Sequence, residues 1–201
     1  MSLFLNQVQI DKAAQVLIND GLLAFPTETV YGLGCISTSE KAFNKLVKIK
    51  KRAPEKPFTL MCSSLDQLSN YIDLSEKDKK IISKFMPGPL TLILKAKKGV
   101  PHYIDLGTGF IGFRIPQNEY ALKLIDKVNV PLLVPSANVS TLPPALNDID
   151  VYDYFPLGVD AIVKGECGSG VPSTVVKFNE KEFKIYREGP ISLEDLKESI
   201  K

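Results

Sequence analysis

The chain has 201 residues, 44% of them hydrophobic, which is enough for one sizeable core but too little for two comfortable domains, so we expect a single domain over residues 1–201. Its 25 lysines and arginines balance 23 aspartates and glutamates to a formal net charge of +2, which argues against a globally basic nucleic-acid binder and leaves any basic site local. No apolar run approaches the roughly 20 residues that a membrane span needs, and the N-terminus lacks a signal-like pattern, so no membrane association is expected.

The N-terminal part is predicted to alternate helices with buried strands. Apolar residues recur at helical spacing over residues 7–20, and Gly21 follows as a C-terminal stop. The apolar run 22–25 then predicts a short buried strand. A second helix is expected to begin near residues 37–39, where three hydroxyl side chains offer N-caps.

The rest of the chain continues this alternation. We expect strands over 57–62, 90–95, 110–116, 132–134, 161–163 and 173–176, helices over 63–68, from Ser75, over 118–127 and from Ser192, loops over 99–109 and 142–150, and a hairpin tip over 178–183. No repeat or linker interrupts the pattern. The sequence therefore predicts an α/β fold in which one twisted, mixed parallel and antiparallel sheet is flanked by helices.

Residues 25–34 place polar side chains where the first predicted strand ends at a proline, and open α/β sheets bind their ligands at such strand ends. Gly32 and Gly34 are expected to allow a tight turn or a close approach to a ligand. On composition alone, a polar turn from strand to helix is the more ordinary interpretation. The polar side chains are Thr27, Glu28, Thr29 and Tyr31.

A basic segment follows the second predicted helix. Six cations fall within residues 45–56 against one carboxylate, Glu55, which favours a local anion site because Arg and Lys both bind phosphate. A solvated helix end is an equally good interpretation, since cations also suit the negative end of the helix dipole. The cations are Lys45, Lys48, Lys50, Lys51, Arg52 and Lys56.

Single polar residues also stand out on later predicted strands. Arg114 lies in an apolar strand, where it either joins a structural ion pair or faces a cleft with an anionic ligand. Ser136 and Asn138 follow another strand and are expected to donate hydrogen bonds or to cap a turn. Ser136 is a poor nucleophile candidate, because His102 is the only histidine and no Gly-x-Ser-x-Gly motif is present.

The three cysteines, Cys35, Cys62 and Cys167, are odd in number and widely spaced. This spacing argues against a disulfide framework and against a thiolate zinc site. We therefore expect no protein-held metal and a reducing, cytoplasmic compartment.

Residues 26–34, Pro-Thr-Glu-Thr-Val-Tyr-Gly-Leu-Gly, resemble the opening motif of the YrdC family. Four more matches follow in the family's order, and together the five motifs extend from residue 25 to residue 189. The resemblance implies the YrdC/RibB-like fold, an α/β single domain with a central basic cleft. The later motifs are Lys50-x-Arg52 with Pro57, Ser136-x-Asn138, Pro172-Ser173-Thr174-Val175-Val176 and Arg187-x-Gly189.

Members of the family join L-threonine, bicarbonate and ATP to give threonylcarbamoyl-AMP and pyrophosphate. Partner proteins then transfer the threonylcarbamoyl group to tRNA. The resemblance therefore implies a nucleotidyltransferase that uses ATP with Mg²⁺, partner proteins that accept the product, and a weak contact with tRNA. Neither chemical step requires an enzyme nucleophile, so positioning and charge stabilisation suffice for catalysis.

Site residues are carried over from the family motif by motif. Lys50 and Arg52 are the expected catalytic pair, and they also bind ATP together with Asn138 and Arg187. Tyr31 is expected to close the pocket with its ring, and Glu28 to form a hydrogen bond within its own motif. The expected threonine-binding residues are Thr29, Tyr31, Arg114, Ser136 and Ser173.

The chain departs from the family at several positions. Ala53 replaces the first proline of the second motif, and Met61 stands where some relatives carry histidine. Residues 140–146 lack the usual glycine and the last hydroxyl of that segment. Longer relatives append a second domain that covers the active site, so closure here is expected from the chain's own loops.

Two other functions stay open. An RNA-binding module would need a broad basic face with exposed aromatic side chains. A paralogue of the same fold would use another carbamoyl-adenylate chemistry, as the related module of the hydrogenase-maturation carbamoyltransferases does.

Overall fold

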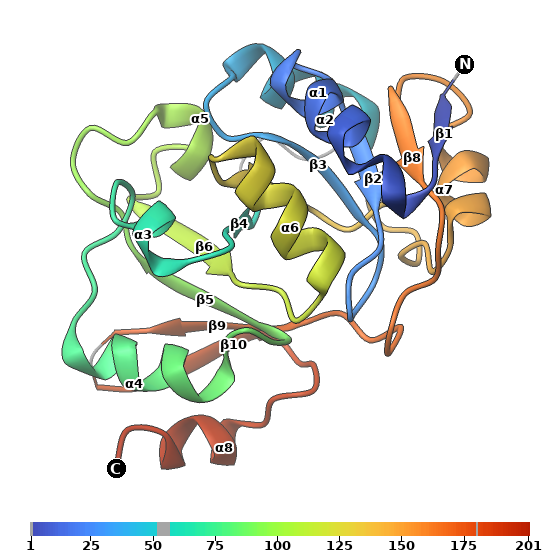
Figure 1. Cartoon of the computed structure of the whole chain (residues 1–201). Helices are drawn as coiled ribbons and strands as arrows, with labels where there is room; N and C mark the ends of the chain where they lie inside the picture. The colour runs from blue at the N-terminus through green and yellow to red at the C-terminus, as the bar shows by residue number, and fades with distance from the viewer. Residues whose placement is uncertain (1, 52–56, 180) are drawn as a thin grey trace.

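A mixed β-sheet organises the chain in the computed structural model, which describes residues 2–51, 57–179 and 181–201 (Figure 1). Within these residues ten strands form one sheet in the order β1-β8-β2-β3-β7-β4-β6-β5-β9-β10. The strands are β1 (Leu3–Leu5), β2 (Leu23–Phe25), β3 (Gly32–Ile36), β4 (Leu60–Met61), β5 (Leu90–Lys95), β6 (Phe110–Arg114), β7 (Leu132–Leu133), β8 (Ala161–Val163), β9 (Thr174–Phe178) and β10 (Phe183–Arg187).

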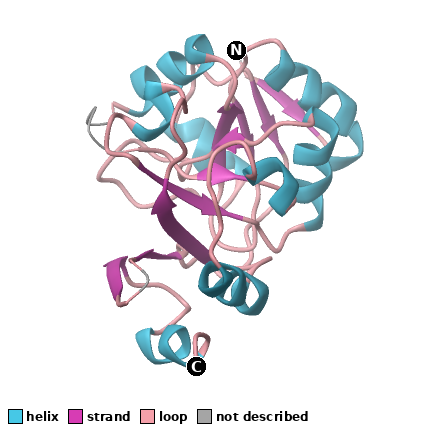
Figure 2. Cartoon of the chain, turned by 90° about the vertical axis from the view of Figure 1, so that its left-hand side faces the viewer, coloured by secondary structure: helices cyan, strands magenta, loops and turns pink. Residues whose placement is uncertain are grey.

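Helices lie on both sides of this sheet, as the side view shows (Figure 2). Figure 1 places α1 and α6 together on one face, and α8 beside the β9–β10 end near the C-terminus. The helices are the 3₁₀ turn η1 (Gln7–Gln9), α1 (Ile10–Ile18), α2 (Glu40–Lys50), α3 (Leu65–Leu68), α4 (Glu76–Phe85), α5 (His102–Asp105), α6 (Glu119–Val128), α7 (Asp148–Tyr154) and α8 (Leu193–Glu198).

Strand pairing confirms the predicted mixed sheet. Parallel pairs are β1–β8, β2–β8, β4–β6 and β5–β9. The other neighbours run antiparallel. The order of the strands brings segments that are far apart in sequence to neighbouring positions, so Arg114 at the end of β6 lies opposite Met61 of β4.

The sheet separates two hydrophobic cores, because successive side chains of a strand point to opposite faces. Leu23 and Phe25 of β2 join the core under α1 and α6, while Ala24 between them joins the core on the other face. Capping contacts fix where the helices begin. The predicted capping boxes at Ser75 and Ser192 are both present.

The glycines of the first motif lie in a strand, so the predicted turn from strand to helix is wrong. Gly32 and Gly34 belong to β3, which pairs with β2 and β7. A Cβ atom on Gly32 would come within 2.6 Å of the Val134 side chain, and one on Gly34 within 3.1 Å of the Phe25 ring. Close packing between neighbouring strands therefore explains both glycines.

Two predicted loops contain short helices, and one strand was not predicted. α5 lies within residues 99–109, and α7 begins at Asp148 inside the predicted 142–150 loop. Asn147 caps α7 by accepting a hydrogen bond from the Asp150 amide at 2.8 Å. The sequence does not predict β1, because this three-residue segment is extended only by its pairing with β8, more than 150 residues away.

Candidate active site

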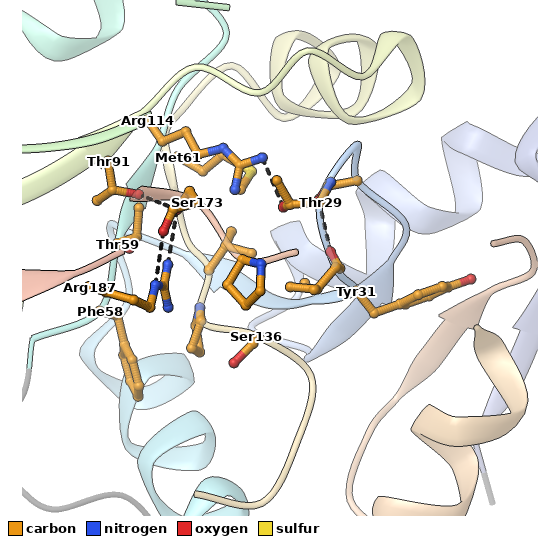
Figure 3. Close-up of a pocket in the computed structure, with 16 residues that line it drawn as sticks. Thr29, Tyr31, Phe58, Thr59, Met61, Thr91, Arg114, Ser136, Ser173 and Arg187 are labelled. Carbon is orange, nitrogen blue, oxygen red and sulfur yellow. Dashed lines mark hydrogen bonds between the residues drawn. The ribbon is translucent and has the colours of Figure 1, made fainter. Parts of the chain in front are cut away.

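Several motif residues meet at a cavity of about 590 Å³ of empty space, including the solvent at its mouth. Its walls come from the loop after β2, from β4, β5 and β6, from the segment after β7, and from the β9–β10 hairpin (Figure 3). The lining residues are Thr27, Thr29, Val30, Tyr31, Gly32, Phe58, Thr59, Met61, Thr91, Arg114, Val134, Pro135, Ser136, Pro172, Ser173 and Arg187.

Arg114 is the buried cation of this cavity, with 5% of its surface exposed. Its Nε donates to the Gly88 carbonyl at 3.1 Å. Its Nη2 donates to the Thr29 hydroxyl at 3.0 Å and lies 2.6 Å from Glu28 Oε1. These contacts use three of the five guanidinium N–H groups, and the two on Nη1 have no hydrogen-bond partner among the described residues.

The hydroxyls of Thr27 and Thr29 extend this network, and the donor of each of their hydrogen bonds can be assigned. Thr27 Oγ1 donates its single hydrogen to the Val30 carbonyl at 2.7 Å. The 3.0 Å contact between the two hydroxyls must then be donated by Thr29. Because Thr29 also accepts from Arg114, its oxygen keeps one lone pair for another hydrogen bond. The Thr29 hydroxyl can therefore accept a hydrogen bond from a ligand, but it has no hydrogen left to donate to one.

Glu28 is held by residues outside its own motif, so the predicted hydrogen bond within the motif is wrong. Its Oε1 accepts from Arg114 and from the Gln117 amide, the latter at 2.9 Å. Its Oε2 is buried and has no hydrogen-bond partner among the described residues. Arg114 thus meets both sequence interpretations, because it belongs to an ion pair and also lines a cavity.

Ser173 and Arg187 form a second guanidinium–hydroxyl group across the cavity (Figure 3). Arg187 Nε donates to the Ser173 carbonyl at 2.9 Å, and its Nη2 donates to the Ser173 hydroxyl at 3.0 Å. The same hydroxyl lies 2.8 Å from Thr91 Oγ1. Ser173 is buried, whereas Arg187 is exposed, so this group connects the cavity with solvent.

Lys50 and Asn138 shape the loop that carries Ser136. Lys50 is 1% exposed, and its Nζ donates to the Ser136 and Asn138 carbonyls at 2.5 and 2.6 Å. The Asn138 amide accepts from the Ser136 hydroxyl at 2.6 Å and donates to the Leu142 carbonyl at 2.5 Å. Neither Lys50 nor Asn138 is among the described residues that line the cavity. The burial of Lys50 also contradicts its interpretation as part of a solvated helix end.

Tyr31 does not close the cavity with its ring. The ring points away from the cavity, and its hydroxyl donates to the Val163 carbonyl at 2.6 Å and lies 3.1 Å from the Gly165 carbonyl (Figure 3). Burial raises the pKa of this phenol above its usual value. The predicted catalytic residue Arg52 lies outside the described residues.

Two cavity residues, Thr59 and Thr91, were not singled out from the sequence, and both contribute hydroxyls. Met61, which the sequence marked as a departure from the family, lines the cavity beside Arg114 and is 3% exposed (Figure 3). Thr91 carried a usable signal, because it is the one hydroxyl in an otherwise apolar strand before Lys95. Thr59 had no such signal, since it occupies an ordinary strand-entry position.

The part of the chain that the structure describes contains no group of three or more His, Cys, Asp or Glu side chains that would hold a metal ion. Burial raises the pKa of the Cys35 and Cys62 thiols to about 12, so neither is an activated nucleophile. None of the described helices has the length and apolar character needed to cross a membrane.

Residues 15–189 match the model of the Sua5/YciO/YrdC family, whose description reads "Telomere recombination". The chain belongs to this family. It is 35% identical to the threonylcarbamoyl-AMP synthase of Pyrococcus abyssi over 94% of its own length. It is 33% identical to a putative threonylcarbamoyl-AMP synthase of Methanocaldococcus jannaschii, over 90% of this chain and 85% of that relative.

The fold is that of a solved member of the family. The crystal structure of P. abyssi Sua5 complexed with L-threonine has a TM-score of 0.92 and 32% identity to this chain, and the match covers 100% of this chain and 61% of the other. The chain spans little more than half of the P. abyssi synthase, 56% of its length.

Proposed function

We propose that this Sua5/YciO/YrdC-family protein is an enzyme, a nucleotidyltransferase that makes L-threonylcarbamoyl-AMP and pyrophosphate from L-threonine, bicarbonate and ATP. The observation that carries the proposal is Arg114, which is buried in the cavity wall with both Nη1 hydrogens unused by the described residues. A planar guanidinium of this kind suits a carboxylate. The names of the relatives and the threonine complex of P. abyssi Sua5 support the same choice.

Threonine is proposed to lie with its carboxylate on Arg114 Nη1. The remaining lone pair of Thr29 then accepts a hydrogen from the amine or hydroxyl of the substrate, because Thr29 has no hydrogen left to donate. Ser136 and Ser173 line the same cavity and complete the proposed threonine site.

The chemistry needs positioning and no enzyme nucleophile. The neutral amine of threonine attacks the carbon of bicarbonate, which loses water and leaves a carbamate. A carbamate oxygen then attacks the α-phosphorus of ATP, and the bond to pyrophosphate breaks. Both steps bring anions together, so fixed cations at the cavity stabilise the reacting groups.

Arg187 is proposed to bind the ATP phosphates, because it reaches the cavity from its exposed side. Arg52 is proposed as a phosphate ligand on the strength of its motif alone. Lys50 and Asn138 are proposed to act through the Ser136 loop, since a direct phosphate contact would require Lys50 to release the loop carbonyls. We assign no protein ligand to Mg²⁺, which is proposed to arrive bound to the phosphates of ATP.

The RNA-binding alternative has one observation in its favour. Lys177 Nζ lies 3.1 Å from the centre of the Phe110 ring, and Lys184 Nζ lies 5.3 Å from that of the exposed Tyr186. Aromatic rings beside cations are suited to stacking nucleic-acid bases. Filter binding of transcribed tRNA at two salt concentrations tests this alternative, together with the proposed weak tRNA contact of the synthase.

A substrate-omission assay tests the proposed function. Purified protein is incubated with ATP, L-threonine, bicarbonate and Mg²⁺, and pyrophosphate release is measured with each component left out in turn. Release should require all three substrates, and the product should react with the partner proteins that modify tRNA. Release that is independent of threonine would overturn the proposal in favour of another carbamoyl-adenylate chemistry.

A further inference from the structure

We propose that Glu28 is a positioning residue that fixes the Arg114 guanidinium in the orientation that presents Nη1 to the carboxylate of the amino-acid substrate. This inference rests on the proposed function and deepens it. It assigns a role to a carboxylate of the first motif that is not among the residues lining the cavity.

The contacts of Arg114 define the orientation. A guanidinium is planar, so contacts at Nε and Nη2 fix the direction of Nη1 as well. Gly88 holds Nε, while Glu28 and Thr29 hold the two hydrogens of Nη2. Of these three acceptors only Glu28 carries a charge, and charge-assisted hydrogen bonds are the stronger ones.

Glu28 is itself held rigidly. The Ser169 amide donates to the Glu28 carbonyl at 2.8 Å, between parallel contacts from Gly168 to Thr27 and from Gly170 to Thr29. The Gln117 amide fixes Oε1 from the loop after β6. The backbone of Glu28 is therefore held by the 168–170 segment and its carboxylate by Gln117, as a positioning group requires.

The charge of the pair has a further consequence. The Arg114 and Glu28 side chains are 7% and 17% exposed, so the ion pair is largely desolvated and nearly neutral before substrate arrives. A substrate carboxylate then shares the guanidinium with Glu28. Glu28 thus opposes anion binding by its charge and favours it by orienting Nη1. The inference requires the orienting effect to be the larger one, so tighter threonine binding by Glu28→Ala would overturn it.

The test measures L-threonine binding by calorimetry and the KM values for threonine and ATP. Glu28→Ala should raise the threonine Kd and KM by about tenfold, which matches the loss of one charge-assisted hydrogen bond, and leave the KM for ATP within about twofold. Glu28→Gln keeps an acceptor at Oε1 and should show a smaller rise, about threefold. Glu119→Ala, which removes an exposed carboxylate from its pair with Lys123, is the matched control.

A double variant and a substrate analogue decide whether Glu28 acts through Arg114. In an Arg114→Ala background, Glu28→Ala should add no further loss of threonine affinity, because the group that it positions is gone. L-threoninamide, which lacks the carboxylate charge, should bind the parent and Glu28→Ala equally weakly. Additive losses in the double variant would overturn the inference, and so would equal losses for threonine and threoninamide.

The outcomes also separate this inference from the proposed function. A parent protein that fails to bind L-threonine contradicts the proposed function. A parent that binds threonine while folded Glu28→Ala binds it equally well contradicts only the role of Glu28. If Glu28→Ala does not fold, Glu28→Asp and Glu28→Gln decide. Aspartate keeps the negative charge but moves the carboxylate oxygen away from Arg114. A positioning role therefore requires Glu28→Asp to lose threonine affinity.

Discussion

The two arginines of the cavity differ in how they are held. Arg114 is buried, paired with Glu28 and fixed at both Nε and Nη2. Arg187 is exposed, and its Nε and Nη2 donate to neutral oxygens of Ser173. Both guanidiniums are held at Nε and Nη2, so the difference lies in their burial. A desolvated cation suits a small ligand of defined shape, and an exposed one suits a larger ligand that extends into solvent.

Replacement of Arg114 should have the largest effect. Arg114→Ala removes the proposed carboxylate contact and leaves Glu28 without its cation, so we expect threonine-dependent pyrophosphate release to fall by at least about a hundredfold. Stability should also fall by about 3 kcal/mol in urea unfolding, since one partner of a largely buried pair remains. Lys123→Ala is the exposed control, and a loss below threefold in turnover would remove Arg114 from the site.

Lys50→Met tests the part of the cavity wall that contains Ser136, which Lys50 holds in place. The Nζ donates to three oxygen atoms of residues 136 and 138, which would be left without that donor. We expect a stability loss of about 3 kcal/mol in urea unfolding and a rise in the KM for threonine. Lys48→Met, an exposed change on the same helix, should have little effect, and a Lys50→Met protein of parental stability would contradict the loop-holding role.

Gly168→Ala tests the backbone contact beneath Glu28 and Thr29. A Cβ atom at this position would overlap the Glu28 carbonyl oxygen, so the loop must shift. We expect a rise of about tenfold in the KM for threonine with a smaller change in the KM for ATP, because a displaced Glu28 would no longer make its strong hydrogen bond to Arg114. Ser169→Ala removes an exposed hydroxyl that bonds to the Val171 backbone and keeps the Ser169 amide on the Glu28 carbonyl, so it serves as the control.

Replacement of Arg187 should have the smallest effect and the greatest dependence on salt. Arg187→Ala should raise the KM for ATP by about fivefold, and the difference from the parent should shrink as ionic strength rises, because exposed charges are screened. Lys184→Ala on the same strand is the control. Salt-independent losses would mean that Arg187 is held as firmly as Arg114 in the working enzyme.

The sequence predicted well those features that depend on local pattern. The capping boxes at Ser75 and Ser192 were expected from their local spacing. The meeting of Thr29, Arg114, Ser136 and Ser173 at one cavity was expected from the family resemblance and not from a local pattern. The central basic cleft stays a prediction.

The errors lie where distant contacts overrule local preference. Gly32 and Gly34 suggest a turn locally, but pairing with β2 and β7 makes them a strand. The partners of Glu28 and the direction of the Tyr31 ring depend on residues more than eighty positions away, which no local pattern contains. Lys50 could be identified as important, but only its burial reveals that it holds a loop.

The strand order also has a consequence for biosynthesis. The walls of the cavity come from segments between Thr27 and Arg187, and Thr91 meets Ser173 only through the parallel β5–β9 pair. Contacts of such long sequence separation form late, because closing large loops costs entropy before the contacts repay it. A ribosome-bound chain therefore has no complete ligand site until its last strands have emerged, and fragments that end before β9 should be devoid of threonine affinity.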